Sequence, residues 1–255
     1  GQYGLLDDYA GIFKESGEWS SESIYEIIYK DDNAVRSWGS PLTAGGTVLP
    51  SLLSPHSWPD GAMGHDQGWG FCPVREETYG RYADNDIRRD VTCFDAAATG
   101  VTYNKRYQDT GFFLEKYAAI SGNNKDQKAD AQLNWNNNLR IYRYAETLLN
   151  AAELLVRTNG NLAEAKKYLN AVRQRAGLTT ELEPTIDNII EERRLEFVGE
   201  GKRYWDLIRS GKAVTTLVPD LYGYRTNSWT ENKKYLPIPQ SEIDAAQGTL
   251  IQNNY

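Results

Sequence analysis

The strongest constraint on the fold is a run of apolar residues at helical spacing that begins at residue 139. The stripe consists of Leu139, Tyr142, Leu148, Leu149, Ala152 and Leu155. Residues three and four apart lie on one helix face, so this spacing predicts an amphipathic helix that stops at Thr158 to Gly160. Asn161 can cap a second helix, with Glu164 as in a capping box, and that helix runs to Gly177. The two together predict an antiparallel helical hairpin.

Other segments have weaker but readable patterns. A third helix is expected after Thr185, and a turn at Gly199–Gly201 leads to a short helix that ends at Gly211. Near the N-terminus, residues 4–15 have the pattern of an amphipathic helix. Ser23–Tyr29 is rich in β-branched and aromatic residues, which is typical of a buried strand.

Residues 37–80 lack sustained periodicity and are rich in glycine and proline. The segment predicts a long loop, and structureless loops longer than about 15 residues are usually functional when they are ordered. Short strands are expected after this loop, at Val91–Phe94 and Phe112–Tyr117.

The net charge limits the kinds of partner that the chain is expected to bind. The net charge is -7, whereas affinity for a phosphate backbone comes from clustered lysine and arginine, so nucleic acid is not expected as a partner. No apolar run approaches the ~18 residues of a membrane-spanning helix. The 17 tyrosines and 7 tryptophans stand beside a single methionine, a surplus of aromatic residues that requires an explanation.

Charged residues are concentrated in the block Glu191–Arg209. Paired carboxylates would suit a glycoside hydrolase, which needs one acid with a raised pKa and a second that stays ionised. Here nearly every acid has an arginine three or four residues away, which stabilises the ionised form. The block therefore favours a structural ion-pair network, and a hydrolase is the less favoured reading.

Other reactive residues give few signals. His56 and His65 are nine residues apart, which does not match the helical spacing of a metal pair. Asp84–Asp86 resembles the start of a calcium loop but lacks its glycine and terminal glutamate. No cofactor is expected, with calcium left open. Cys72 and Cys93 fit a disulfide and two reduced thiols equally well.

Loop tryptophans offer a binding surface, because an indole face is flat apolar area for the C–H face of a sugar. If each ring buries about 50 Å², it contributes about 1 kcal/mol, and two or three rings with hydrogen bonds give roughly mM to μM affinity. Trp38 and Trp58 flank polar turns and are expected to be exposed, whereas Trp69 can be packed. The candidate ligand-binding residues are Trp38, Trp58, Trp69, His56, Tyr222 and Trp229.

The alternative for each tryptophan is that it pins the loop to the helices. Trp205 lies in the charged helical block and is assigned to the core, and Trp135 is left open.

The second half of the chain contains four ordered blocks: Arg140–Leu149, Leu169–Leu178, Glu191–Arg209 and the closing Leu236–Pro239 with Gln252–Tyr255. Together they resemble the C-terminal domain of the SusD/RagB family of outer-membrane nutrient-binding lipoproteins. Upstream, Gly4–Ala10, Ser21–Ile27 and Asp84–Asp90 also look like the family.

The resemblance implies a mainly α, SusD-like fold: a tetratricopeptide-like helical scaffold with long irregular loops and a few short strands. It further implies a cell-surface subunit that binds a glycan or other nutrient, performs no chemistry and delivers it to a SusC-like TonB-dependent transporter. Residues 1–255 would be the C-terminal domain, without the family's N-terminal helical half and without the lipid anchor at the outer membrane. A helical-repeat scaffold that binds only protein is the alternative.

Overall fold

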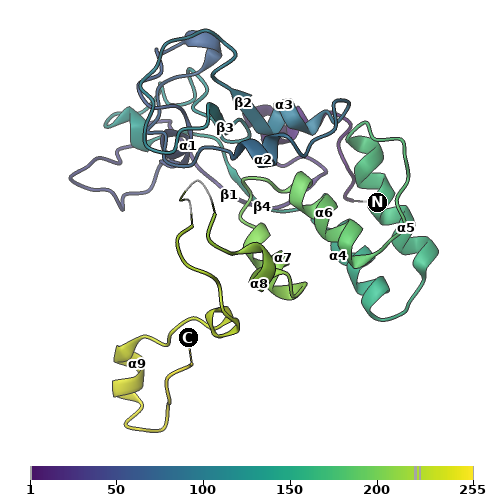
Figure 1. Ribbon diagram of the computed structural model, residues 1–255. Coiled ribbons are helices and arrows are strands. Elements are labelled where there is room, and N and C mark those ends of the chain that lie inside the picture. The colour runs from purple at the N-terminus through teal and green to yellow at the C-terminus, as the bar shows by residue number, and fades with distance from the viewer. Residues whose placement is uncertain (1, 221–222, 224, 255) are drawn as a thin grey trace. The chain divides into compact units, whose positions relative to one another are not determined.

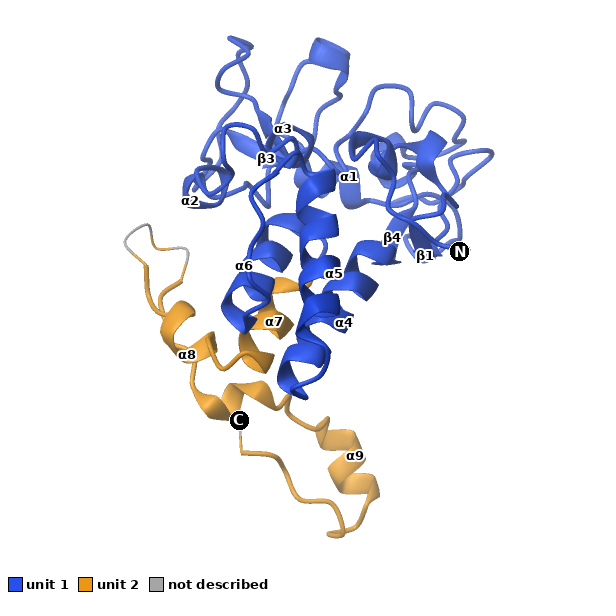
Figure 2. Ribbon diagram, turned by 90° about the vertical axis from the view of Figure 1, so that its right-hand side faces the viewer, with its two compact units in different colours: residues 1–201 blue, residues 202–255 orange. Residues whose placement is uncertain are grey.

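The structure is a computed structural model, and it describes residues 2–220, 223 and 225–254 (Figure 1). Its contacts divide the chain into two compact units, Gly1–Gly201 and Lys202–Tyr255 (Figure 2). Most regular elements in the described residues are helices, with a few short strands, as the mainly α prediction expects. None of the helices in this part of the chain is both long and apolar enough to cross a bilayer.

Three packed helices form the helical core of the first unit (Figure 2). They are α4 (Tyr144–Arg157), α5 (Leu162–Arg175) and α6 (Ile186–Glu196), and α4 packs against both of the others. The side chain of Asn161 accepts from the backbone N–H of Glu164 at 3.1 Å, which starts α5 as predicted. The helical hairpin and the third helix are therefore confirmed.

The start of the first helix is not where the periodicity placed it. Leu139–Arg143 forms strand β4, which pairs antiparallel with β1 (Ser23–Ile27), and α4 begins only at Tyr144. The backbone N–H of Tyr144 donates to the carbonyl of Glu22 at 2.8 Å. Pairing with a strand distant in sequence thus overrides the local helical pattern. The strand predicted over Ser23–Tyr29 is confirmed for Ser23–Ile27, but its expected burial is wrong, because Tyr25 is exposed and only Glu26 is buried.

The helix expected over residues 4–15 is also wrong. The segment contains two 3₁₀ turns, Ala10–Phe13 and Glu15–Gly17. A side chain at Gly17 would lie 1.9 Å from the carbonyl oxygen of Gly11, so the chain folds back on itself in a way that a continuous helix cannot. The apolar residues of the first turn are still buried against the core.

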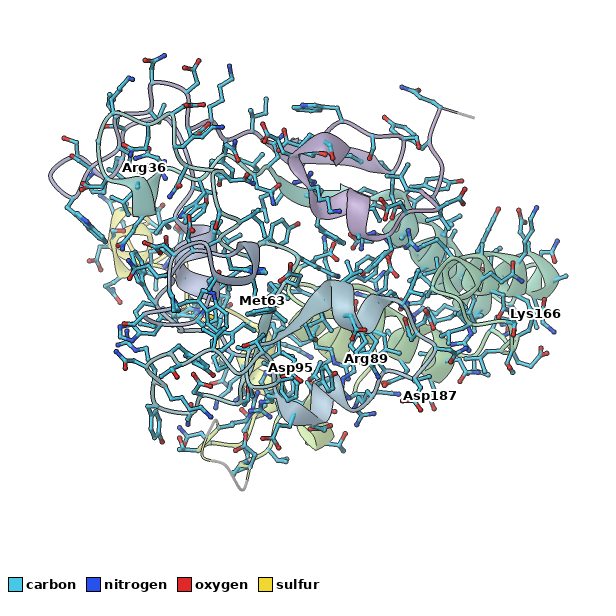
Figure 3. All side chains as sticks on the ribbon, turned by 90° about the horizontal axis from the view of Figure 1, so that it is seen from above. Arg36, Met63, Arg89, Asp95, Lys166 and Asp187 are labelled. Atoms are coloured by element: carbon cyan, nitrogen blue, oxygen red, sulfur yellow. The ribbon has the colours of Figure 1, made fainter. Side chains whose placement is uncertain are left out.

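The long loop contains only short regular elements: α1 (Leu49–Leu53), a 3₁₀ turn at Ala62–Gly64 and α2 (Glu76–Tyr79). After it come α3 (Arg88–Thr92), the antiparallel pair β2 (Cys93–Asp95) and β3 (Phe112–Leu114), and a 3₁₀ turn at Ala131–Leu133. Viewed from above, Arg36 near the start of this region and Lys166 on α5 lie at opposite sides of the first unit (Figure 3).

A buried network of ion pairs joins β4, α5 and α6. Arg143 donates to three carboxylates: Glu22 at 2.6 Å, Glu196 at 3.1 Å and Glu200 at 2.8 Å. Arg175 of α5 contacts Glu22 at 2.8 Å and Glu196 at 2.5 Å. All five charged groups are almost completely removed from solvent.

Arg88 extends the network to α3, with contacts to Asp86 at 2.7 Å, Glu192 at 2.6 Å and Glu196 at 3.1 Å. The prediction that the Glu191–Arg209 block is a structural ion-pair network is confirmed for Glu192 and Glu196. The partners expected for these two acids were wrong, because their arginines come from other elements. Asp206, by contrast, pairs with Arg209 three residues away at 2.8 Å, as expected.

The second unit has short helices and a small core. Its elements are α7 (Arg203–Arg209), α8 (Ala213–Thr216), a 3₁₀ turn at Glu231–Lys234 and α9 (Gln240–Ala245). The core contains Leu207, Ala213, Leu217 and Trp229. Trp205 was expected in the core, but it is 54% exposed, because the buried positions of α7 are those of Asp206 and Leu207.

Candidate functional site

Three aromatic side chains of the long loop converge on the surface of the first unit. The ring centroids of Trp38 and Trp69 lie 5.7 Å apart with their planes at 33°, and those of Trp69 and Phe71 lie 5.9 Å apart at 55°. Trp38 is 62% exposed, Phe71 is exposed and Trp69 is half-buried. We refer to Trp38, Trp69 and Phe71 as the aromatic platform.

A cation lies beside the platform. The guanidinium carbon of Arg106 lies 4.8 Å from the centroid of the Phe71 ring, and its Nη1 donates to the carbonyl of Trp69 at 3.1 Å. Arg106 is exposed, and a guanidinium carries five N–H donors in a planar fork. The platform therefore combines flat apolar faces with a hydrogen-bond donor at its edge, which is the combination that a sugar ring requires.

Backbone hydrogen bonds to α1 fix the segment that carries Trp69 and Phe71. The N–H of Trp69 donates to the carbonyl of Ser51 at 2.6 Å, and the N–H of Phe71 donates to the carbonyl of Leu52 at 3.0 Å. A side chain at Gly68 would lie 2.4 Å from the carbonyl oxygen of Ser54, so only glycine permits this approach. Gly68 is thus required for the close backbone approach that positions the Trp69 ring.

The structure contradicts the exposure expected for Trp58. This indole is 2% exposed. Its ring contacts Phe94 and Tyr103 at centroid distances of 5.3 and 5.6 Å, and its Nε1 donates to the carbonyl of Ala62 at 2.9 Å. Trp58 therefore pins the loop to the core, which is the alternative that the sequence left for each tryptophan.

The remaining candidates are dispersed. His56 is half-buried and lies beside the platform segment, because its backbone forms a bridge with Gly68 and its Cβ adjoins Gly70. Trp229 is buried in the second unit, where its Nε1 donates to the hydroxyl of Tyr204 at 3.1 Å. Tyr222 lies outside the described residues. Trp135, which the sequence left open, is buried.

Sequence reasoning missed Phe71 and Arg106. Phe71 follows Trp69 at an interval of two, which in extended backbone can place both side chains on one side, so a signal was present. Arg106 belongs to a different segment and gave no local signal.

Glu196, a buried carboxylate of the Glu191–Arg209 block, does not have the properties of a catalytic acid. Burial alone would raise the pKa of Glu196, but Arg175, Arg143 and Arg88 outweigh burial and lower the pKa to about 2. A glycosidase acid needs a raised pKa and access to substrate, and this carboxylate has neither. Glu196 therefore does not supply the catalytic acid that a hydrolase site in the Glu191–Arg209 block would require.

The described part of the chain contains no cluster of three or more histidine, cysteine, aspartate or glutamate residues that could hold a metal ion. Both carboxylate oxygens of Asp86, in the segment that resembles a calcium loop, accept hydrogen bonds from Arg88.

Cys72 is an exposed free thiol and Cys93 a buried one, so the two are not bridged.

Comparisons with known proteins agree with this architecture. The profile of the SusD family matches residues 90–255. Surface glycan-binding protein A from Bacteroides thetaiotaomicron is 70% identical with a TM-score of 0.93, and the match covers 100% of this chain and 56% of that protein. A structure of surface glycan-binding protein A from the same organism in complex with laminarihexaose gives the same values.

More distant proteins give the same result. A laminarin-binding SusD-like protein is 32% identical with a TM-score of 0.82, over 99% of this chain and 54% of that protein. A SusD-like protein of Formosa agariphila is 28% identical, over 94% of this chain and 50% of that relative. The chain thus spans about half the length of the curated relatives it matches. From the profile match and the shared fold, this chain belongs to the SusD family.

Proposed function

We propose that this chain binds a laminarin-type glucan, a chain of glucose units with β-1,3 linkages, through the aromatic platform. The observation that carries the proposal is the surface pair of Trp38, which is 62% exposed, and Trp69, which is half-buried, with ring centroids 5.7 Å apart. The choice of glucan is supported by the 70% identity to a surface glycan-binding protein that has been solved with laminarihexaose.

The platform can account for weak, reversible binding. A ring that buries about 50 Å² against a sugar contributes about 1 kcal/mol, and three rings together with donors from Arg106 give roughly mM to μM affinity after the cost of association. Such affinity suits a protein that captures a sugar and then releases it.

We further propose that the complete protein lies at the cell surface, attached to the outer membrane by a lipid anchor, and passes its ligand to a SusC-like TonB-dependent transporter. The family membership supports both points. Binding would occur without a cofactor. It would also occur without hydrolysis, because the acids Glu192 and Glu196 of α6 are buried against arginines. Residues 1–255 would correspond to the C-terminal domain of the family.

Calorimetric titration tests the site. Wild-type protein should bind laminarihexaose more tightly than cellohexaose or maltohexaose, which contain the same sugar in different linkages. Trp38→Ala should weaken binding about fivefold, as expected for the loss of about 1 kcal/mol, and the double variant with Trp69→Ala should show no measurable binding. Trp19→Ala is the matched control, because Trp19 is also 62% exposed but lies outside the platform.

Two results would count against the proposal. If the double variant binds laminarihexaose as well as wild type does, the platform is not the site. If no oligosaccharide binds while the protein still associates with a transporter, the protein-only scaffold is the correct reading. Release of reducing ends from laminarin would instead indicate a hydrolase.

A further inference from the structure

The segment 126–132 runs beside the loop segment that carries Trp38. Backbone hydrogen bonds join the two segments at intervals: Asn33 N to Asp126 O at 3.1 Å, Lys128 N to Ala34 O at 2.8 Å and Asp130 N to Arg36 O at 3.4 Å. The side chain of Asn134 adds a bond to the carbonyl of Arg36 at 2.8 Å. The backbone just before Trp38 is therefore held against this segment over several residues.

Side chains of the same segment reach both tryptophans of the platform. Oδ2 of Asp130 accepts from the backbone N–H of Trp38 at 2.9 Å. Oε1 of Gln132 accepts from the indole Nε1 of Trp69 at 3.2 Å. One short piece of chain thus binds the backbone of Trp38 and the indole ring of Trp69, two residues that are separated by a long stretch of sequence.

Gln132 is itself fixed relative to Trp69 through Ser51 of α1. The hydroxyl of Ser51 donates to the carbonyl of Gln132 at 2.8 Å and accepts from the Nε1 of Trp135 at 2.8 Å. The carbonyl of Ser51 accepts from the backbone N–H of Trp69. Ser51 is fully buried, so Trp69 and its amide partner are both hydrogen-bonded to the same residue of the interior.

We propose that Gln132 is a positioning residue for glycan binding: it fixes the tilt of the Trp69 ring relative to Trp38 before the ligand arrives. This inference rests on the proposed function. Gln132 acts through its amide oxygen, which accepts the hydrogen bond from the indole N–H of Trp69. Because that N–H is already bonded within the protein, Trp69 contacts the sugar through its ring face and not through its N–H. A ring ordered in advance does not have to be immobilised on binding, which favours affinity.

The test compares two variants of similar size at one position. Gln132→Leu removes the acceptor, and Gln132→Glu keeps a carboxylate oxygen for the indole N–H. Gln132→Leu should weaken binding of laminarihexaose about 3- to 10-fold, the range for one hydrogen bond, and Gln132→Glu should restore it to within about twofold. Gln174→Leu makes the same substitution at an exposed position of α5 and should leave the affinity unchanged.

A second measurement needs no ligand. Two indoles at 5.7 Å and a fixed tilt should give an exciton couplet in far-ultraviolet circular dichroism. The couplet should disappear in Trp38→Ala, weaken in Gln132→Leu and persist in Gln132→Glu, with the melting temperature of all three close to that of wild type.

The outcomes separate the two proposals. If Trp38→Ala with Trp69→Ala abolishes binding but Gln132→Leu binds and gives the couplet as wild type does, the positioning role is wrong and the site stands. Equal losses in Gln132→Leu and Gln132→Glu would also refute it, because the acceptor would not be the cause. Undiminished binding by the double tryptophan variant would refute the proposed function itself.

Discussion

Glu196 is a position at which removing a single charge should cost much stability. Its carboxylate contacts Arg88, Arg143 and Arg175 at 3.1, 3.1 and 2.5 Å, and the residue is fully buried. Burial acts to raise its pKa, and the three arginines together lower the pKa from the usual 4.5 to about 2. The folded state therefore strongly prefers the ionised carboxylate.

The magnitude follows from linkage. A pKa lowered from 4.5 to about 2 corresponds to about 3 kcal/mol at roughly 1.4 kcal/mol per pKa unit. Because the pKa in the folded state is the lower one, this stability is present above pH 4.5 and is lost as the pH falls from 4.5 toward 2. Glu196→Gln should lose a similar amount at neutral pH, about 3 to 5 kcal/mol, because Arg88, Arg143 and Arg175 each lose one of their buried carboxylate partners.

Urea unfolding at pH 7, 5 and 3, followed by tryptophan fluorescence, measures this effect. Wild type should lose stability most steeply between pH 5 and 3, and Glu196→Gln should be less stable at pH 7 with a shallower pH dependence. Glu191→Gln is the matched control on the same helix, because the Glu191 side chain is 44% exposed and pairs with Arg81 at 3.2 Å, a surface pair worth about 0 to 1 kcal/mol. Equal effects of the two substitutions at pH 7 would refute the argument.

Three further predictions concern the loop and its surroundings. Trp58→Ala should destabilise the protein by about 3 to 5 kcal/mol, measured by urea unfolding, because it empties a packed site. A thiol reagent should label Cys72 in the native protein, whereas Cys93, which is buried and whose pKa burial raises to about 12, should react only on unfolding. Burial alone would lower the pKa of His65, but hydrogen bonding to Glu115 outweighs burial and raises the pKa, so thermal unfolding should show stability lost as the pH rises above 6.5 in wild type and not in His65→Gln.

The helices could be predicted where local signals agreed. The predicted cap at Asn161 and the predicted start after Thr185 are both present, because capping depends on residues three positions apart. At Leu139–Arg143 the local pattern suited a helix equally well, and only the pairing with Ser23–Ile27 decided for a strand. Information of that kind lies far away in the sequence and is invisible to a periodicity argument.

Trp38 and Trp58 show the same limit for the site. Each stands beside a polar turn that contains proline and glycine, so the sequence predicted exposure for both. Trp58 is buried because Phe94 and Tyr103 arrive from later segments and cover it. No such group covers Trp38, which contacts Trp69 at the surface instead. Local sequence therefore identified the loop as the segment that carries the candidate tryptophans, and tertiary contacts decided which of their rings are exposed to solvent.

A ring that must keep one face free for a ligand cannot be held in place by complete burial, since complete burial would remove that face. This explains why Trp38 and Trp69 are held by polar bonds from Asp130, Gln132 and Ser51, whereas Trp58 is held mainly by other rings. Apolar packing contributes in proportion to the area removed from water, but a hydrogen bond contributes little net stability and fixes a direction. Substituting a polar anchor of the platform should therefore reduce affinity with little loss of stability, and substituting Trp58 should do the reverse.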